Sequence, residues 1–306
     1  MEMKTIQTDR LTRTFDKGKV TALQEVSFAV EKGEIFGLIG PDGAGKTTLI
    51  RILASLILPD SGSASLAGFD PVRDYARVRQ IIGYMPGRFS LYQDLSVQEN
   101  LRFFATVFKA DLETNYPLIK DLYDQLAPFK NRRAGQLSGG MKQKLALCCA
   151  LVHEPEILLL DEPTTGVDPV SRREFWDMLI RLKARGITIL VSTPYMDEAT
   201  LCDRIALIQK GTILETGTPA EIPRRLSRPV YAASAGDMYL LLRAVRDYPE
   251  THSCYTFGES HHVQLKSGSP QDLLDFLGGR IPGPVALDQI EPGIEDVFMD
   301  KMTSRT

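Results

Sequence analysis

The sequence predicts an α/β protein in which a largely parallel β-sheet is followed by a small α+β domain. In the first two-thirds of the chain, short apolar runs alternate with segments of helical periodicity, a pattern typical of strands joined by crossover helices. The runs at 157–160 and 187–191 are continuously apolar, as strands buried on both faces are. Farther on, the pattern weakens into short strands, Gly- and Pro-rich turns and one clear helix at 270–277. We therefore expect a large domain over residues 1–217 and an accessory or regulatory domain over residues 218–306.

The bulk composition is that of an ordinary globular protein. Of its 306 residues, 43% are hydrophobic and 25% are charged, and the formal net charge is -3. A net negative chain has no electrostatic footprint for nucleic acid, so we expect no nucleic-acid partner. The four cysteines have neither metal-ligand nor redox spacing, which suits a reducing cytosol. No window approaches the roughly 18–20 consecutive apolar residues of a membrane span, so another subunit would have to supply any membrane crossing.

A glycine-rich loop follows the first strongly apolar strand. The run IFGLI at 35–39 leads directly into GPDGAGKTT, and residues 47–56 then have a helical pattern. Strand, glycine loop and helix in this order form a phosphate loop, whose glycines let backbone N–H groups close around a phosphate. Lys46 is predicted to reach the β and γ oxygens, and the Thr47 hydroxyl to ligate Mg²⁺. The predicted nucleotide contacts are Gly40, Pro41, Asp42, Gly43, Ala44, Gly45, Lys46, Thr47 and Thr48.

A pair of acidic residues ends the buried run at 157–160. Asp161 and Glu162 follow it directly, and open α/β sheets bind their ligands at the carboxyl ends of strands. Many strand ends are acidic, so the pair becomes informative because a phosphate loop is also present. We expect Asp161 to hold Mg²⁺ through water and Glu162 to polarise an attacking water as general base. Lys46, Asp161 and Glu162 are therefore the predicted catalytic residues.

The remaining segments of the large domain have two different characters. Residues 6–30 combine alternation with turn residues, which favours an antiparallel flap. Residues 88–150 are mostly helical and form an inserted helical subdomain. The sequence SVQE at 96–99 is a capping box, and apolar residues follow it at the spacing of one helix face.

A second anion-binding helix start lies far downstream of the phosphate loop. In LSGGMKQ, at 137–143, Ser138 suits an N-cap, while Gly139 and Gly140 leave the first amides open to close approach. Taken alone, this is a well-capped helix. Together with the phosphate loop and the Asp161–Glu162 pair, it resembles the signature of the ATP-binding cassette (ABC) family.

The resemblance spans residues 1–215 and implies both ligands and partners. In that family two cassettes dimerise head to tail, and each ATP lies between the phosphate loop of one copy and the signature of the other. The resemblance thus implies ATP with Mg²⁺, a second cassette in a homodimer or heterodimer, and a transmembrane permease subunit. Phe15 lies where the family stacks an aromatic side chain on adenine. Asp168, in TGVD at 165–168, lies in a loop that touches the partner cassette.

Further stretches of the sequence indicate which class of ABC protein the chain resembles. The stretches at 40–46, 83–92 and 294–298 resemble ATPases of ABC-2-type exporters, and most closely the first cassette of YbhF-like multidrug-export ATPases. This implies the ATP-binding subunit of an exporter, cytoplasmic and peripheral on the inner face of the cell membrane. Residues 88–97 lie next to the family's coupling surface, which makes them the expected contact with the permease.

Two positions depart from the family pattern. Gly87 stands where the family has a glutamine that contacts Mg²⁺ and the attacking water, and Pro194 stands where it has a histidine. Thr193 suits an N-cap and Pro194 a first helical position, so we expect the fold to tolerate proline there. Proline offers the γ-phosphate neither an imidazole nor an N–H. We therefore expect intact nucleotide binding and attenuated hydrolysis; the alternative is that Ser192, Thr193 or an ordered water substitutes for the missing groups.

Two other functions remain open alongside an exporter ATPase. One is a non-hydrolytic regulatory cassette that completes a partner's ATP site. The other is a nucleic-acid- or ribosome-associated cassette, although the paired cassettes, coiled coils and zinc modules typical of that class are absent from the sequence. The adjacent His261 and His262 point to opposite sides of a predicted strand, so we expect a surface role and no metal site.

Overall fold

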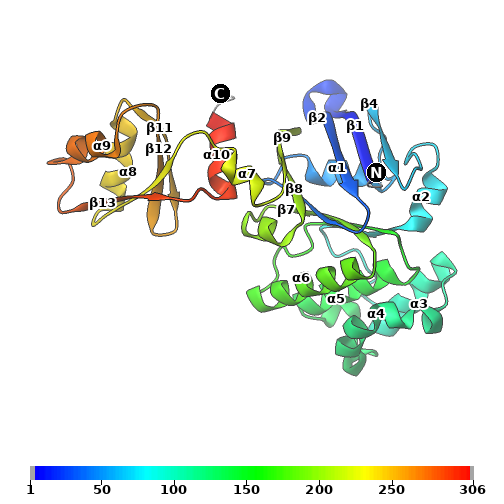
Figure 1. The fold of residues 1–306 in the computed structure, drawn as a ribbon. Helices are drawn as coiled ribbons and strands as arrows, with labels where there is room; N and C mark the ends of the chain where they lie inside the picture. Colours follow the sequence, from blue (N-terminus) through cyan, green and yellow to red (C-terminus); the bar gives the residue numbers. More distant parts are fainter. Residues whose placement is uncertain (1–3, 304–306) are drawn as a thin grey trace. The chain divides into compact units, whose positions relative to one another are not determined.

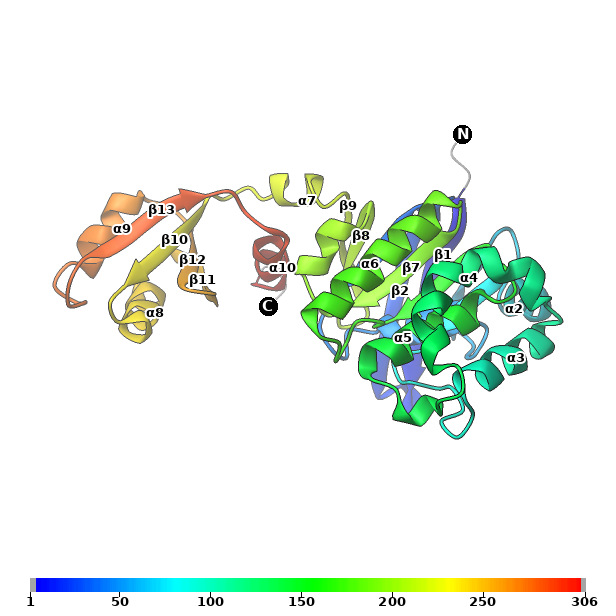
Figure 2. The same cartoon turned by 90° about the horizontal axis from the view of Figure 1, so that it is seen from below.

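The chain folds into two compact units, each with its own β-sheet structure. The computed structural model describes residues 4–303; the first unit ends at Thr218 and the second begins at Pro219. No helix among these residues is long and apolar enough to cross a membrane. Figures 1 and 2 show the elements of both units.

A six-stranded sheet organises the first unit. Its spatial order is β5 (Ile82–Met85), β6 (Ile157–Asp161), β7 (Thr188–Thr193), β3 (Ile35–Ile39), β8 (Arg204–Gln209) and β9 (Thr212–Gly217). All neighbours are parallel except β8 and β9. Every residue of β3, β6 and β7 is buried, which explains their continuous apolar sequences. The carboxyl ends of four adjacent strands, β5, β6, β7 and β3, therefore meet at one edge.

A second, antiparallel sheet confirms the predicted flap. It consists of β2 (Val20–Glu31), β1 (Lys4–Phe15) and β4 (Ser61–Leu66). Helix α1 (Lys46–Leu53) shares one apolar core with both sheets. In that core the rings of Phe28 and Phe36, one from each sheet, stack with centroids 5.3 Å apart. The phosphate-loop helix is thus fixed between two sheets.

Three α-helices of the first unit begin within residues 88–150, the segment that the sequence marked as helical, and the other α-helices of this unit lie outside it (Figure 2). Their bounds are α2 (Tyr75–Ile81), α3 (Val97–Phe108), α4 (Leu112–Leu126), α5 (Gly139–Leu151) and α6 (Pro169–Ala184). Short 3-10 turns occupy Asp16–Gly18, Ala127–Phe129, Ala134–Gln136 and Asp197–Leu201. The capping box at the start of α3 is confirmed, because Ser96 Oγ accepts from Glu99 N while a Glu99 carboxylate oxygen accepts from Ser96 N.

The second unit has the β-α-β-β-α-β order of a ferredoxin-like fold. Its antiparallel sheet runs β11 (Thr251–Phe257), β12 (Ser260–Leu265), β10 (Val230–Ala235) and β13 (Val285–Ile290). Three helices accompany α7 (Glu221–Arg224): α8 (Met238–Asp247), α9 (Pro270–Leu277) and α10 (Ile294–Thr303). Side chains of α8 and α9 form one core with the sheet.

The expectation of a surface role for His261 is wrong. His261 is 3% exposed; its Nε2 lies 2.7 Å from Met238 O and its Nδ1 lies 3.0 Å from Thr256 Oγ1. His262 faces the other side of the sheet, as expected, and its Nδ1 lies 2.8 Å from Asp296 Oδ1 on α10. Two further pairs bind the same face of α10 to the sheet: Asp300 with His252 and Thr303 with Tyr255. The described residues contain no group of three potential metal ligands.

Replacing Asp296 with alanine should release α10 from the sheet. Asp296 is buried, and its second carboxylate oxygen accepts from Gly293 N at 2.7 Å. Its loss leaves His262 Nδ1 and Gly293 N, which are both partly buried, without these bonds, and a fully buried group left unsatisfied costs about 1–3 kcal/mol. Hydrogen exchange of the α10 amides should therefore accelerate in Asp296→Ala and stay unchanged in the control Glu291→Ala, whose side chain is exposed. Unchanged protection in Asp296→Ala would show that apolar contacts alone hold α10.

Candidate nucleotide-binding site

The glycine loop after β3 has the conformation of a phosphate cradle. Gly43 and Gly45 have φ values of 75° and 106°, a left-handed backbone that favours glycine. A Cβ on Gly45 would lie 2.4 Å from Ala22 O, so a larger residue would also collide with β2. Gly45 is the N-cap of α1, and no described side chain caps this helix start. Its first amides are thus available to an anion.

Lys46 places a buried ammonium inside this loop. Its side chain is 2% exposed, and Nζ donates to Gly40 O at 2.7 Å and to Pro41 O at 3.0 Å. Nζ also lies 3.1 Å from Glu162 Oε1. Of the three donors of the ammonium group, two are used by these carbonyl oxygens, and Glu162 forms an ion pair with it. A phosphate oxygen that contacts Lys46 therefore competes with the Glu162 carboxylate for the ammonium group.

Thr47 and Asp161 meet beside the loop and fit a magnesium ion. Thr47 Oγ1 donates to Asp161 Oδ1 at 3.1 Å, and Ser192 Oγ donates to the same oxygen at 2.9 Å. Asp161 is buried at the end of β6. Mg²⁺ is bound in proteins by carboxylates, hydroxyls, water and substrate phosphates, so this oxygen pair next to a phosphate loop suits it.

Glu162 is held in a strained conformation by Ser192. Its φ is 49°, which is unfavourable for a residue with a Cβ. Its backbone N–H lies 3.1 Å from both the carbonyl oxygen and Oγ of Ser192. Ser192 thus fixes both Asp161 and Glu162. The sequence predicted for Ser192 only an alternative role as substitute donor, not this role in fixing the acidic pair; the signal available was a hydroxyl side chain near the carboxyl end of a buried strand.

Gly87 and Pro194 flank the acidic pair, because β5 and β7 are the neighbours of β6. A Cβ on Gly87 would lie 3.0 Å from Asp161 O, a close contact. The expectation that Thr193 caps a helix beginning at Pro194 is wrong. The helical turn begins three residues later, at Asp197, and Thr193 Oγ1 accepts from Tyr195 N at 3.1 Å within a tight turn.

The start of α5 matches its predicted capping but lies apart from the phosphate loop. Ser138 Oγ accepts from Met141 N at 3.4 Å. A Cβ on Gly140 would lie 2.8 Å from Ser171 Oγ, so this glycine also permits close packing against α6. Among residues 4–303, no hydrogen bond or ion pair joins Ser138, Gly139 or Gly140 to Lys46 or Asp161.

Asp168 and Phe15 also lie outside the cluster around Lys46. Asp168 is the N-cap of α6, and the hydrogen bond from Ser171 N, at 2.9 Å, lowers the pKa of its carboxyl group. Phe15 ends β1 and is 36% exposed, with the Arg13 guanidinium carbon 4.9 Å from its ring centroid. The structure therefore brings together the phosphate loop, Asp161 and Glu162, and leaves Phe15, Ser138 and Asp168 facing other groups.

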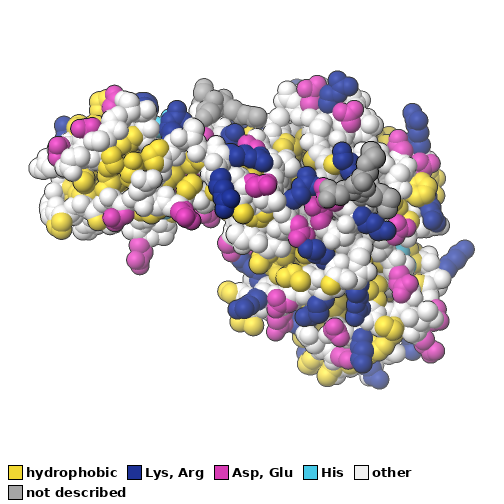
Figure 3. Space-filling view, viewed as in Figure 1, with side chains coloured by type: hydrophobic (Ala, Val, Ile, Leu, Met, Phe, Trp, Pro, Cys, Tyr) yellow, Lys and Arg dark blue, Asp and Glu magenta, His cyan; other side chains and the backbone are white. Residues whose placement is uncertain are grey.

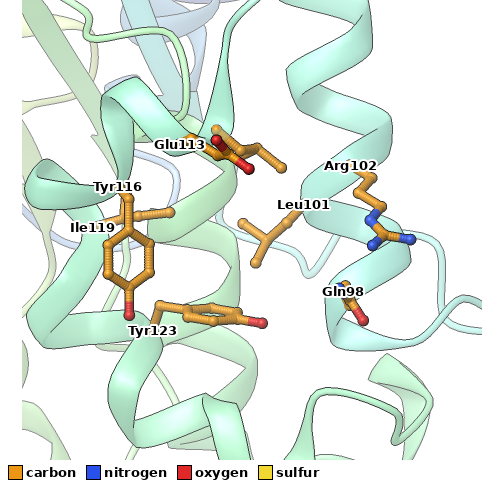
Figure 4. A pocket seen from close by; sticks show the side chains of 8 residues that line it. Gln98, Leu101, Arg102, Glu113, Tyr116, Ile119 and Tyr123 are labelled. Atoms are coloured by element: carbon orange, nitrogen blue, oxygen red, sulfur yellow. The ribbon is translucent and has the colours of Figure 1, made fainter.

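A separate hollow between α3 and α4 has a different chemistry (Figure 4). It has a volume of about 360 Å³. Leu101 and Arg102 come from α3, while Tyr116 and Tyr123 come from α4 and meet edge to face with centroids 6.1 Å apart. Its lining is mainly apolar and contains none of the sequence-predicted site residues. It is therefore distinct from the nucleotide site.

The chain is similar to known ATP-binding proteins of transporters. A sequence model of the ABC transporter family matches residues 23–165. The chain is 40% identical over 284 residues to the probable multidrug ABC transporter ATP-binding protein YbhF of Escherichia coli K12, covering 91% of this chain but 49% of YbhF. It is 42% identical over 305 residues to the doxorubicin resistance ATP-binding protein DrrA of Mycobacterium tuberculosis H37Rv, covering 96% of this chain and 92% of DrrA.

A solved structure supplies the third comparison. It is a dimeric ATP-binding cassette in a post-hydrolysis state, bound to ADP and Pi. It has a TM-score of 0.63 and 25% sequence identity, and the match covers 70% of this chain and 98% of that one. The chain thus spans about half the length of YbhF, nearly all of DrrA and one whole cassette.

Proposed function

Because the chain belongs to the ABC transporter family of ATP-binding proteins, we propose that it is the ATP-binding subunit of an exporter. The observation that carries this proposal is the sheet edge at which β3, β6 and β7 bring Lys46, Asp161, Glu162 and Ser192 together. The relatives named above support the direction of transport, since they are described as multidrug and doxorubicin resistance proteins. Their cargoes differ, and the permease selects the cargo.

Some residues of the site bind the nucleotide, and another takes part in its hydrolysis. The loop amides and Lys46 hold the phosphates, and Lys46 exchanges Glu162 for a phosphate oxygen. Thr47 and Asp161 hold Mg²⁺, which neutralises charge on the phosphates when bound. Release from Lys46 frees the Glu162 carboxylate to accept a proton from the attacking water. The contact between Lys46 and Glu162 thus links nucleotide binding to activation of Glu162 as the general base.

A second cassette completes the site in this proposal. Ser138 and Asp168 are not bonded to the phosphate loop of their own chain, and the start of α5 is exposed at Ser138 and Gly139. A helix start with uncovered amides suits the γ-phosphate of a nucleotide bound by another copy. The dimeric state of the solved relative supports this arrangement.

Hydrolysis at this site should be slow. Gly87 and Pro194 follow the two strands beside Asp161, and neither offers a side-chain donor to the γ-phosphate or the water. Losing one preorganised donor commonly costs about 10²–10³ in rate. Ground-state binding relies on Lys46 and the loop, which are intact. The same two residues favour a second candidate function, a regulatory cassette whose Ser138 completes a faster partner's site.

An apolar groove of the first unit is the proposed docking surface for the permease. Its volume is about 700 Å³, and Ser90 and Leu91, within the expected contact segment, line it. The other apolar and aromatic lining residues include Leu56, Tyr84, Met85, Phe104, Val107 and Phe108. Such a groove suits an apolar helix face of a membrane subunit, which would hold the chain at the inner face of the membrane. Basic and acidic side chains are interspersed on the face shown in Figure 3, a distribution unlike a nucleic-acid-binding surface.

The proposal predicts different defects for Lys46→Ala and Ser138→Arg. Lys46→Ala removes the buried ammonium and should weaken ATP binding by at least about tenfold, the loss of one charged hydrogen bond or more. Ser138→Arg should leave binding of ATP by the monomer unchanged but abolish ATP-dependent dimerisation. Calorimetry measures the first property and light scattering the second. Wild-type protein that fails to bind MgATP would overturn the proposal.

A further inference from the structure

One side chain of α6 holds the segment that follows Pro194. The Arg172 guanidinium carbon lies 4.2 Å from the centroid of the Tyr195 ring. Its Nη1 lies 3.6 Å from Asp197 Oδ2, and its Nε lies 3.6 Å from Glu198 Oε1. A single arginine therefore contacts three of the four residues from 195 to 198.

The partner of Arg172 at the end of this segment is a buried carboxylate. Glu198 is 1% exposed, and neither of its carboxylate oxygens has a hydrogen-bond partner among the described residues. Within that part of the chain, Arg172 is the one cation at ion-pair distance from Glu198. A buried pair with so few hydrogen bonds is a poor source of stability. Its geometry is better suited to fixing one segment against another.

The held segment is bonded to the phosphate loop. Tyr195 N–H donates to Thr193 Oγ1 at 3.1 Å, and Gly40 N–H donates to Thr193 O at 3.2 Å. Gly40 also provides a carbonyl oxygen to Lys46. A shift of the segment from 195 to 198 would therefore reach the loop that holds the phosphates through two hydrogen bonds.

At its other end, Arg172 is bonded to the loop that the family resemblance places at the partner cassette. Arg172 N–H donates to Asp168 O at 2.9 Å in the first turn of α6. The neighbouring Ser171 is bonded to the Asp168 carboxylate and packs against Gly140 at the start of α5. The loop at 165–168, the start of α5 and Arg172 thus form one packed group.

We propose that Arg172 is a positioning residue that links the partner-facing loop at 165–168 to the phosphate end of β7. Dimerisation fixes the loop at 165–168, and Arg172 then holds Tyr195 and Glu198 in place relative to that loop. Thr193, which is bonded to Tyr195, in turn fixes the end of β7 at the site. Pro194 has no side-chain donor of its own, so the backbone position there depends on this link. The inference rests on the proposed function, since it assigns a role within ATP-driven dimerisation.

Four variants distinguish a positioning role of Arg172 from a role in the stability of the fold. Arg172→Met alone leaves Glu198 buried without its cation and should lower Tm by several degrees. Arg172→Met combined with Glu198→Gln removes both charges and should bring Tm close to that of wild type. Glu198→Gln alone completes the double-mutant cycle. Arg173→Met is the matched control, because Arg173 is the exposed neighbour of Arg172 on the same helix.

The expected result is a selective loss of turnover in the double variant. Its Kd for a fluorescent ATP analogue and its KM should stay within about twofold of wild type, while kcat falls by about fivefold or more, since misplacing a site by about 1 Å can cost 10²-fold. Trp176, the one tryptophan in the sequence, is buried one turn beyond Arg172 and reports on α6. Its fluorescence response to ATP in wild type should be lost or reduced in the double variant and retained in Arg173→Met.

Three results would contradict the proposed positioning role of Arg172. Full kcat in the double variant, with Tm restored, would show that the pair only supports the fold. An unchanged Trp176 response would show that α6 does not sense this contact. Additive effects of Arg172→Met and Glu198→Gln on kcat would show that they act independently. In all three cases wild-type binding and dimerisation leave the proposed function standing, whereas wild-type protein that does not bind ATP would overturn both.

Discussion

Glu162→Gln should abolish the remaining ATP hydrolysis and tighten ATP binding. The amide cannot accept a proton from water, so kcat should fall by at least about a hundredfold, the contribution of a well-placed general base. Glu162 also competes with phosphate for Lys46, since its Oε1 lies 3.1 Å from Nζ. Removing its charge frees Lys46 and removes repulsion from the γ-phosphate. Single-turnover hydrolysis and a binding titration measure the two effects.

One control variant serves both effects. Glu25→Gln removes an exposed carboxylate of β2 and should change neither kcat nor affinity. Because glutamine has nearly the shape of glutamate, the strained backbone at 162 and its bonds to Ser192 should persist. A Glu162→Gln protein that hydrolyses ATP at the wild-type rate would show that another group activates the water.

The sequence predicts those strands and helices that have a strong pattern of apolar residues within their own bounds. The buried strands β6 and β7 are marked by continuous apolar runs, and α9 by a regular pattern over the bounds it has in the structure. The pairing of β10 with β12 and with β13 was not predictable, because these strands are short and their partners lie far away in the sequence. The burial of His261 depends on the same pairing and on Met238 of α8.

The candidate site also has residues that the sequence predicts and residues that it does not. Lys46, Thr47, Asp161 and Glu162 belong to contiguous motifs, and the structure brings all four together. The bonds of Ser192 to the acidic pair and the contacts of Arg172 were missed because the partners lie on other elements, 31 residues away for Asp161 and 26 for Glu198. Local signals also misplaced the helix after Thr193. A hydroxyl residue followed by proline suits both a helix start and the tight turn observed, and β7 with its neighbours determined which one formed.

Restoring both missing side chains should raise the rate of hydrolysis. Pro194→His supplies an imidazole donor at the end of β7, and Gly87→Gln supplies an amide at the end of β5, on either side of Asp161. Each donor to developing charge is worth about 10²–10³ in rate when correctly placed. Gains below that range are expected here, since the surrounding residues are not arranged for these side chains. Steady-state kcat should rise at least about tenfold in the double variant, with KM little changed because ground-state binding already relies on Lys46.

The close contact at Gly87 decides how this experiment is built. Any Cβ there lies 3.0 Å from Asp161 O, so glutamine must shift β5 or β6 by a few tenths of an ångström. Gly87→Ala measures the effect of that shift without the amide, and Pro194→Ala measures release of the proline constraint without the imidazole. If the double variant gains nothing while Gly87→Ala keeps the wild-type rate and affinity, slow hydrolysis does not originate from these two positions. If Gly87→Ala alone loses activity, the test narrows to Pro194→His, which adds no new Cβ because proline already has one.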